Sequence, residues 1–161
     1  MLIDRTGAID DVWPRIEADA PLPAEGRAIV DFERLEEAAA THLALGVHLA
    51  NTADPRGLRD RLERIALVSV AFPSFADGRG FSIARCLRQI GYRGRLRAVG
   101  PVISDQFGYL LEVGFDEVQI PASVAERQPL DHWLRQLEQV TVGYQRGIPG
   151  RKSILEARHG R

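Results

Sequence analysis

With 161 residues and a formal net charge of −1, the chain is long enough to bury the core of one domain and is nearly neutral. This charge balance argues against general nucleic-acid binding, and no apolar run approaches the roughly 20 residues that a membrane-spanning helix needs. The N-terminus also lacks the basic and apolar regions of a signal peptide. We therefore expect a cytoplasmic protein with no nucleic-acid or membrane partner.

Cysteine and histidine usage limits the metal and redox chemistry of the chain. Cys86 is the only cysteine, so it forms no internal disulfide and supports no cysteine-based zinc or iron–sulfur site. No pair of histidines has ligand spacing on one predicted face among His42, His48, His132 and His159. We expect Cys86 to be a structural thiol, His48 to be a core or interface residue within a strand, and the protein to hold no metal.

The first 30 residues are weakly patterned and are predicted to be an arm laid on the domain. Leu2–Ile3 and Ala8–Ile9 flank Thr6–Gly7, which indicates a small hairpin or a turn, and Arg27–Val30 is a candidate short strand. Asp31 is predicted to cap a first helix with apolar residues at helical spacing. The Asp54–Pro55 pair is predicted to begin a second helix.

Four stretches are predicted as strands, the apolar ones at residues 46–50 and 66–72 and two more at 96–99 and 116–120. Helical patterns follow the second, third and fourth of them, beginning at Phe81, at a cap formed by Ser104 or Asp105, and at Pro129. Gly91 and Gly114 fit the left-handed position after the first two of these helices, and 140–144 is a candidate last strand.

This alternation predicts successive βαβ units with a mainly parallel sheet, as a three-layer α/β domain. Half of a (β/α)8 barrel is the alternative, and its exposed edges would favour a homo-oligomer. We expect the single domain to cover residues 1–146, with the arm in residues 1–30 and a mobile basic tail in residues 147–161.

The loop after the predicted strand 66–72 has the densest polar chemistry in the chain. Gly78 and Gly80 stand before a helix, where backbone N–H groups and the helix dipole favour an anion, and Arg79 offers a bidentate contact. In the alternative interpretation the glycines only make the turn, Ser82 caps the helix, and Arg79 pairs with Asp77. The spacing matches neither a dinucleotide fingerprint nor a P-loop.

Asp77 and Asp105 occupy equivalent loops of successive βα units, so their carboxylates are candidates for one crevice. Their candidate partners for ligand binding or partner docking are Gly78, Arg79, Gly80, Ser82, Arg85 and Gln106. A catalytic role is assigned to none of these residues. Aromatic side chains surround both loops, with core packing as their default role and the wall of a flat-ligand site or a protein-docking surface as alternatives, namely Phe72, Phe75, Phe81, Phe107 and Tyr109.

Residues 72–85 read FPSFADGRGFSIAR and residues 91–100 read GYRGRLRAVG, followed by Asp105-Gln106 and Gly114-Phe115-Asp116. Together they resemble a bacterial family called domain of unknown function 934, often labelled a probable oxidoreductase. The likeness runs from Trp13–Pro14 to Tyr144–Gln145. Genes of that family commonly lie beside the gene for the haemoprotein subunit of sulfite reductase.

The resemblance implies an accessory protein of assimilatory sulfite reduction, which assists sulfite reductase or delivers electrons to it. Its partner would be sulfite reductase or the electron carrier of that enzyme, and the cofactor is left open. The chain departs from the family pattern at Pro101 and Ser104, where an acidic and a basic residue are usual. The alternative is a small anion-binding module or enzyme that uses the Asp77-Gly78-Arg79-Gly80 loop.

Overall fold

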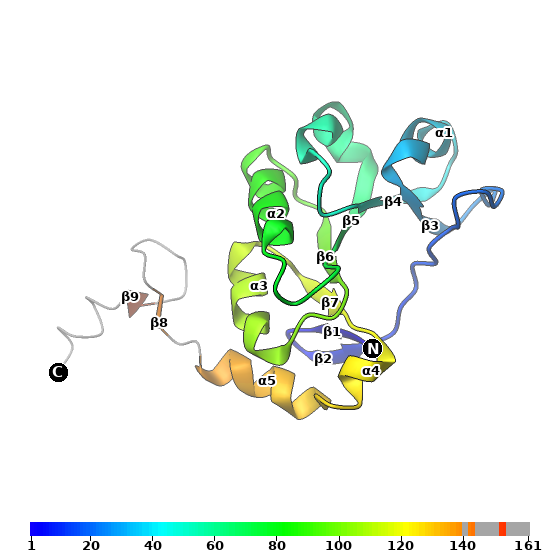
Figure 1. Cartoon of the computed structure of the whole chain (residues 1–161). Coiled ribbons are helices and arrows are strands. Elements are labelled where there is room, and N and C mark those ends of the chain that lie inside the picture. The colour runs from blue at the N-terminus through cyan, green and yellow to red at the C-terminus, as the bar shows by residue number, and fades with distance from the viewer. Residues whose placement is uncertain (140–141, 144–151, 154–161) are drawn as a thin grey trace.

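A computed structural model describes residues 1–139, 142–143 and 152–153 of the chain. Its main sheet has seven strands in the order β2-β1-β7-β6-β5-β4-β3 (Figure 1). The antiparallel hairpin of β1 (Leu2–Asp4) and β2 (Gly7–Ile9) confirms the predicted turn at Thr6–Gly7. The other five strands run parallel to one another: β3 (Arg27–Asp31), β4 (Ala44–Leu49), β5 (Ile65–Ala71), β6 (Arg95–Val99) and β7 (Glu117–Gln119).

Helices follow each parallel strand. Over residues 1–139, five are α-helices: α1 (Leu35–Ala39), α2 (Arg79–Gln89), α3 (Phe107–Val113), α4 (Ala122–Ala125) and α5 (Leu130–Gln139). Three are 3₁₀ helices: η1 (Phe32–Arg34), η2 (Pro55–Arg64) and η3 (Ser104–Gln106). A separate parallel pair joins β8 (Val142–Gly143), within the candidate strand 140–144, to β9 (Lys152–Ser153).

The prediction of a mainly parallel α/β sheet is confirmed. Strands β3 to β7 are neighbours in chain order, and right-handed connections between such strands place the connecting helices on one face. Helix α2 accordingly contacts both η2 and α3. Residues 10–26, named here the crossing segment, run from β2 at one edge to β3 at the other (Figure 1). Helices, sheet and crossing segment together are consistent with the predicted three-layer α/β fold.

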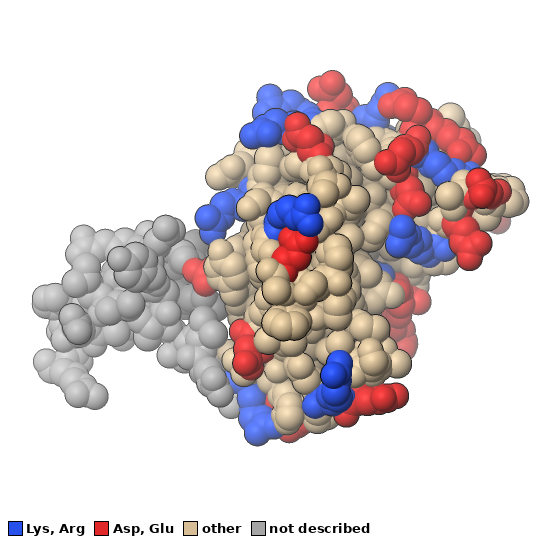
Figure 2. Space-filling model, in the orientation of Figure 1, with Lys and Arg blue, Asp and Glu red and all other residues tan. Residues whose placement is uncertain are grey.

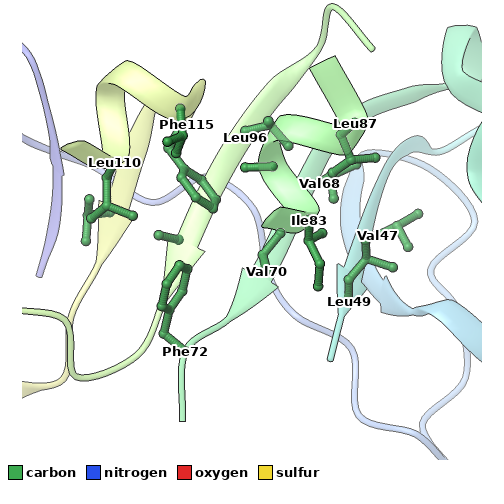
Figure 3. Packing of buried hydrophobic residues seen from close by; sticks show 14 of the residues in the cluster. Val47, Leu49, Val68, Val70, Phe72, Ile83, Leu87, Leu96, Leu110 and Phe115 are labelled. Carbon is green, nitrogen blue, oxygen red and sulfur yellow. The ribbon is translucent and has the colours of Figure 1, made fainter. Parts of the chain in front are cut away.

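The core lies between the sheet and the helices. Side chains alternate along each strand, so Val68 and Val70 of β5 face Ile83 and Leu87 of α2 in the buried cluster (Figure 3). The opposite side of the same strands carries polar side chains, such as Ser69 of β5. One face of the sheet is therefore apolar and covered by helices, and the other is polar and lies under the crossing segment.

Two predicted helix starts are wrong. Helix α2 begins at Arg79 and not at Phe81, because the Asp77 carboxylate accepts the Arg79 N–H and supports an earlier first turn. The helical segment after β6 begins with η3 at Ser104 itself, so neither Ser104 nor Asp105 caps it. Gln106 Oε1 accepts the Ile103 N–H instead.

Other expectations concern the helix ends and the C-terminus. Gly91 and Gly114 have φ values of +100° and +117°, which confirms their predicted left-handed conformation after α2 and α3. Apart from β9, the predicted tail 147–161 lies outside the described residues, and the domain boundaries stay a prediction. Within the described part of the chain, no helix is both long and apolar enough to cross a membrane.

Candidate functional site

The Asp77–Arg79 loop follows β5 at the carboxyl end of the parallel strands, the usual ligand-binding end of such sheets. The Arg79 guanidinium holds the Asp77 carboxylate in a two-point ion pair, with NH2–Oδ2 at 2.6 Å and Nε–Oδ1 at 3.0 Å. Asn51, which follows β4, donates from Nδ2 to Asp77 Oδ2 at 2.5 Å. The two neighbouring strand ends are thus joined through one carboxylate.

The ion pair sets the charge state of the loop. Hydrogen bonds from the Arg79 side chain and backbone lower the pKa of Asp77 to about 2, so its carboxylate is ionised at neutral pH. The same contact raises the pKa of Arg79. The Asp77 side chain is 17% exposed and that of Arg79 is 60% exposed. Arg79 therefore presents an open guanidinium edge whose charge is already balanced.

The other predicted site residues of this loop and of α2 lie as follows. Gly78 is the N-cap residue of α2, and Gly80 is buried against the ring of Phe72, where a Cβ atom would lie 2.5 Å from Cζ. Ser82 lies inside the first turns of α2 and does not cap it. Arg85 is exposed on α2 and joins none of the ion pairs among the described residues.

The loop after β6 packs beside the first loop. Gln106 Nε2 donates to the Phe75 carbonyl at 2.8 Å, which ties the two loops together. Asp105 accepts a hydrogen bond from Gln136 of α5 at 3.2 Å, and the Ser104 N–H donates to Gln128 Oε1 at 2.6 Å. Within the described part of the chain, Asp105 and Asp77 share no hydrogen-bond partner. A shallow pocket of about 220 Å³ beside Asp105 is lined by Ser104, Asp105, His132, Arg135 and Gln136.

An aromatic surface lies over these loops and consists of Phe75, Phe81 and Tyr109. The rings of Phe81 and Tyr109 are 4.9 Å apart, and Phe81 also meets the buried Phe72 edge-on at 5.2 Å. Phe75 is 55% exposed and Tyr109 is 47% exposed. Figure 2 shows a largely uncharged area over α2 and α3, whereas charged side chains gather around α1.

A row of polar side chains across the opposite face of the sheet was missed by the sequence reasoning. Register pairs His48 of β4 with Ser69 of β5, Ser69 with Arg97 of β6, and Arg97 with Glu117 of β7. His48 does lie within a strand as predicted, but its imidazole joins this row. The signal available in the sequence was a polar residue within each of these strands. Only the register between neighbouring strands shows that the polar residues lie in one row.

Among the described residues, no group of three or more His, Cys, Asp or Glu side chains is arranged to hold a metal ion. Comparison with curated proteins gives no match, and neither does comparison with solved structures. The family model described as "Bacterial protein of unknown function (DUF934)" matches residues 46–155, which include both loops and the aromatic surface. Because this match covers more than half of the chain, the protein belongs to that family.

Proposed function

We propose that this protein is an accessory factor of assimilatory sulfite reduction that docks onto sulfite reductase or onto the carrier that supplies its electrons. The observation that carries the docking role is the aromatic surface of Phe75, Phe81 and Tyr109 beside the exposed Arg79. Aromatic residues and arginine are the types enriched at the centres of protein interfaces. The choice of partner comes from the family resemblance at residues 72–85 and 91–100.

The aromatic surface is held in place by contacts within the protein, without any partner. The hydrogen bond from Gln106 fixes the backbone of Phe75, and the Asp77–Arg79 ion pair fixes the loop that follows it. Phe81 is partly buried against Phe72 and supports Tyr109 from below. A rigid aromatic surface loses little conformational entropy on binding, which favours affinity.

An anion-binding module or enzyme built on the Asp77-Gly78-Arg79-Gly80 loop is the second candidate. The two glycines and the exposed Arg79 at the start of α2 favour it. An incoming anion would, however, compete with the Asp77 carboxylate, which already holds two nitrogens of Arg79. We place docking first for this reason.

The docking proposal is tested by affinity capture of a tagged protein from cells grown on sulfate. We expect sulfite reductase or a ferredoxin-like carrier in the captured material. The double variant Phe75→Ser/Tyr109→Ser should reduce its recovery by at least about tenfold, since buried aromatic anchors dominate interface energies. Val12→Ser is the matched control, because Val12 is also an exposed apolar residue but lies on the crossing segment. Capture of neither partner by the wild-type chain, or equal capture by the double variant, would reject the proposal.

The pathway is tested separately by growth of a deletion strain on single sulfur sources. Growth on sulfide or cysteine but not on sulfate or sulfite would place the protein at sulfite reduction. Complementation with the wild-type gene should restore growth on sulfite, whereas the Phe75→Ser/Tyr109→Ser gene should not. Normal growth of the deletion strain on every source would detach the protein from that pathway.

A further inference from the structure

A cavity of about 480 Å³ lies between the crossing segment and the polar face of the sheet. Asp11, Val12, Trp13, Pro14 and Arg15 of the crossing segment form one wall, and strand residues form the other, namely Ile29, His48, Ser69, Val99 and Gln119. Its volume lies in the range typical of small-molecule sites. The strand residues come from β3 to β7, and His48, Val99 and Gln119 lie at or next to the carboxyl ends of their strands. This cavity is separate from the aromatic surface.

The floor of the cavity offers fixed hydrogen-bonding groups. His48 Nδ1 and Ser69 Oγ are 2.8 Å apart, and this is the only hydrogen bond of the imidazole within the described chain. Burial, helped by the nearby Arg15, lowers the pKa of His48 to about 4, so the ring is neutral at neutral pH. Its Nε2 is therefore left to donate or accept a hydrogen bond, and the Gln119 amide lies on the same wall.

The charged groups around the cavity are already paired. Arg15 binds Asp31 at 2.7 Å, and the buried Arg97 binds Asp11 at 2.9 Å and Glu117 at 2.7 Å. An anionic or cationic ligand would have to break one of these ion pairs or add an unbalanced charge to a partly buried site. An uncharged ligand meets no such cost.

The apolar part of the lining suits a flat ring. Trp13 forms one wall, and the Arg27 guanidinium lies 5.9 Å from the centre of its ring. Ile29 and Val99 supply apolar surface from the sheet side. A planar molecule between the indole and the sheet would bury both faces while its edge reaches the histidine and serine.

We propose that the cavity beneath the crossing segment binds an uncharged, planar heteroaromatic compound, with His48, Ser69 and Gln119 at its polar edge and Trp13 against its face. This site goes beyond the docking role, and neither depends on the other.

The test is isothermal titration calorimetry of the full chain with two uncharged heteroaromatic probes, adenosine and riboflavin, and with their 5′-phosphates, AMP and FMN. At least one uncharged probe should bind with a Kd below about 1 mM, and its phosphate should bind at least about tenfold more weakly. His48→Leu should weaken binding about tenfold through the lost hydrogen bonds. Trp13→Ala should do the same and removes only a partly exposed side chain. His42→Leu, at an exposed position before β4, is the matched control.

Three results would overturn the proposal. The first is the absence of binding by either uncharged probe to the folded protein, checked by circular dichroism. The second is tighter binding of the phosphates, which would reject the uncharged class. The third is binding that neither His48→Leu nor Trp13→Ala weakens, because the ligand would then occupy another place.

Discussion

The Asp77 carboxylate is the residue on which the loop after β5 depends, because it receives Arg79 and Asn51 together. Its pKa of about 2 in the folded protein lies below the ordinary aspartate value of 3.8. The ionised carboxylate therefore stabilises the fold fully above about pH 4, and this contribution is lost as the pH falls through 2. Asp77→Asn removes it at neutral pH.

We predict that Asp77→Asn lowers the thermal unfolding temperature at pH 6 and has a smaller effect at pH 2, because about half of the folded wild-type protein is then protonated at Asp77. Unfolding curves of both proteins across this range provide the measurement. Arg79→Gln removes the same ion pair through its other partner. The stability of this variant should therefore depend less on pH between about 4 and 2 than that of the wild type. A constant offset between Asp77→Asn and wild type at all pH values would contradict the assigned ionisation.

The ion pair between Arg97 and Glu117 gives a second prediction at the scale of single residues. Their side chains are 2% and 1% exposed, so removal of one partner leaves a buried charge poorly compensated. Glu117→Leu should lower the free energy of unfolding by about 3–5 kcal/mol, measured by urea denaturation. The double variant Arg97→Met/Glu117→Leu should recover part of this loss.

The control for the buried pair is Asp131→Asn, which breaks the exposed pair of Asp131 and Arg135 in α5. Such exposed pairs contribute only about 0–1 kcal/mol. The two single variants for comparison are Arg97→Met and Glu117→Leu. If the double variant loses as much free energy of unfolding as these two lose together, Arg97 and Glu117 act independently.

At the scale of elements, the connection after β6 depends on a glycine with a special conformation. Gly100 has a φ of +142°, and a Cβ atom there would collide with the carbonyl oxygen of Phe72, which directly follows the neighbouring strand β5. Gly91 has a φ of +100°, but nothing lies within 4 Å of its Cβ position. An alanine at Gly91 meets only the conformational cost of a positive φ, whereas an alanine at Gly100 also meets a steric collision. Comparison of the two substitutions therefore separates these two costs.

We therefore predict that Gly91→Ala costs about 1–2 kcal/mol of stability, the conformational cost alone. Gly100→Ala should cost clearly more, because the backbone of β5 and β6 must also move apart. Thermal and urea unfolding of both variants provide the measurement. Equal losses would show that the turn at Gly100 relaxes without strain.

Strands β4 and β5 were predictable from the sequence because both are largely apolar, and turn residues such as Pro73 and Pro121 marked where the strands β5 and β7 end. The pairing of Arg79 with Asp77 was one stated alternative, since the two residues are close in sequence. Asn51 was not found, because 26 residues separate it from Asp77. The polar row from His48 to Glu117 was missed for the same reason, because it depends on register between strands.

Across the whole molecule, the crossing segment closes the polar face and protects one edge of the sheet. Backbone hydrogen bonds join Ile16 N–H to the Ile29 carbonyl and Ile29 N–H to the Pro14 carbonyl, each at 2.8 Å. The outer edge of β3 is therefore partly occupied, which reduces edge-to-edge pairing with a second copy there. The homo-oligomer expected for a half barrel stays a prediction.

The last prediction concerns how this segment is held. Its side-chain anchors near β3 are the ion pair of Arg15 with Asp31 and the contact of Trp13 with Arg27. Trp13→Ala/Arg15→Ala removes both without touching the helix-covered core. Hydrogen exchange at the amides of Ile16 and Ile29 should then become at least about tenfold faster, since local opening becomes easier.

Amides in the central strands, such as Val68 and Leu96, serve as the internal control and should exchange at the wild-type rate. Such a result would identify the crossing segment as a unit that opens separately from the sheet and could admit a ligand to the cavity below it. An equal increase at Val68 and Leu96 would mean that the segment opens only when the whole domain unfolds. In that case access to the cavity would require a permanent opening beside Trp13.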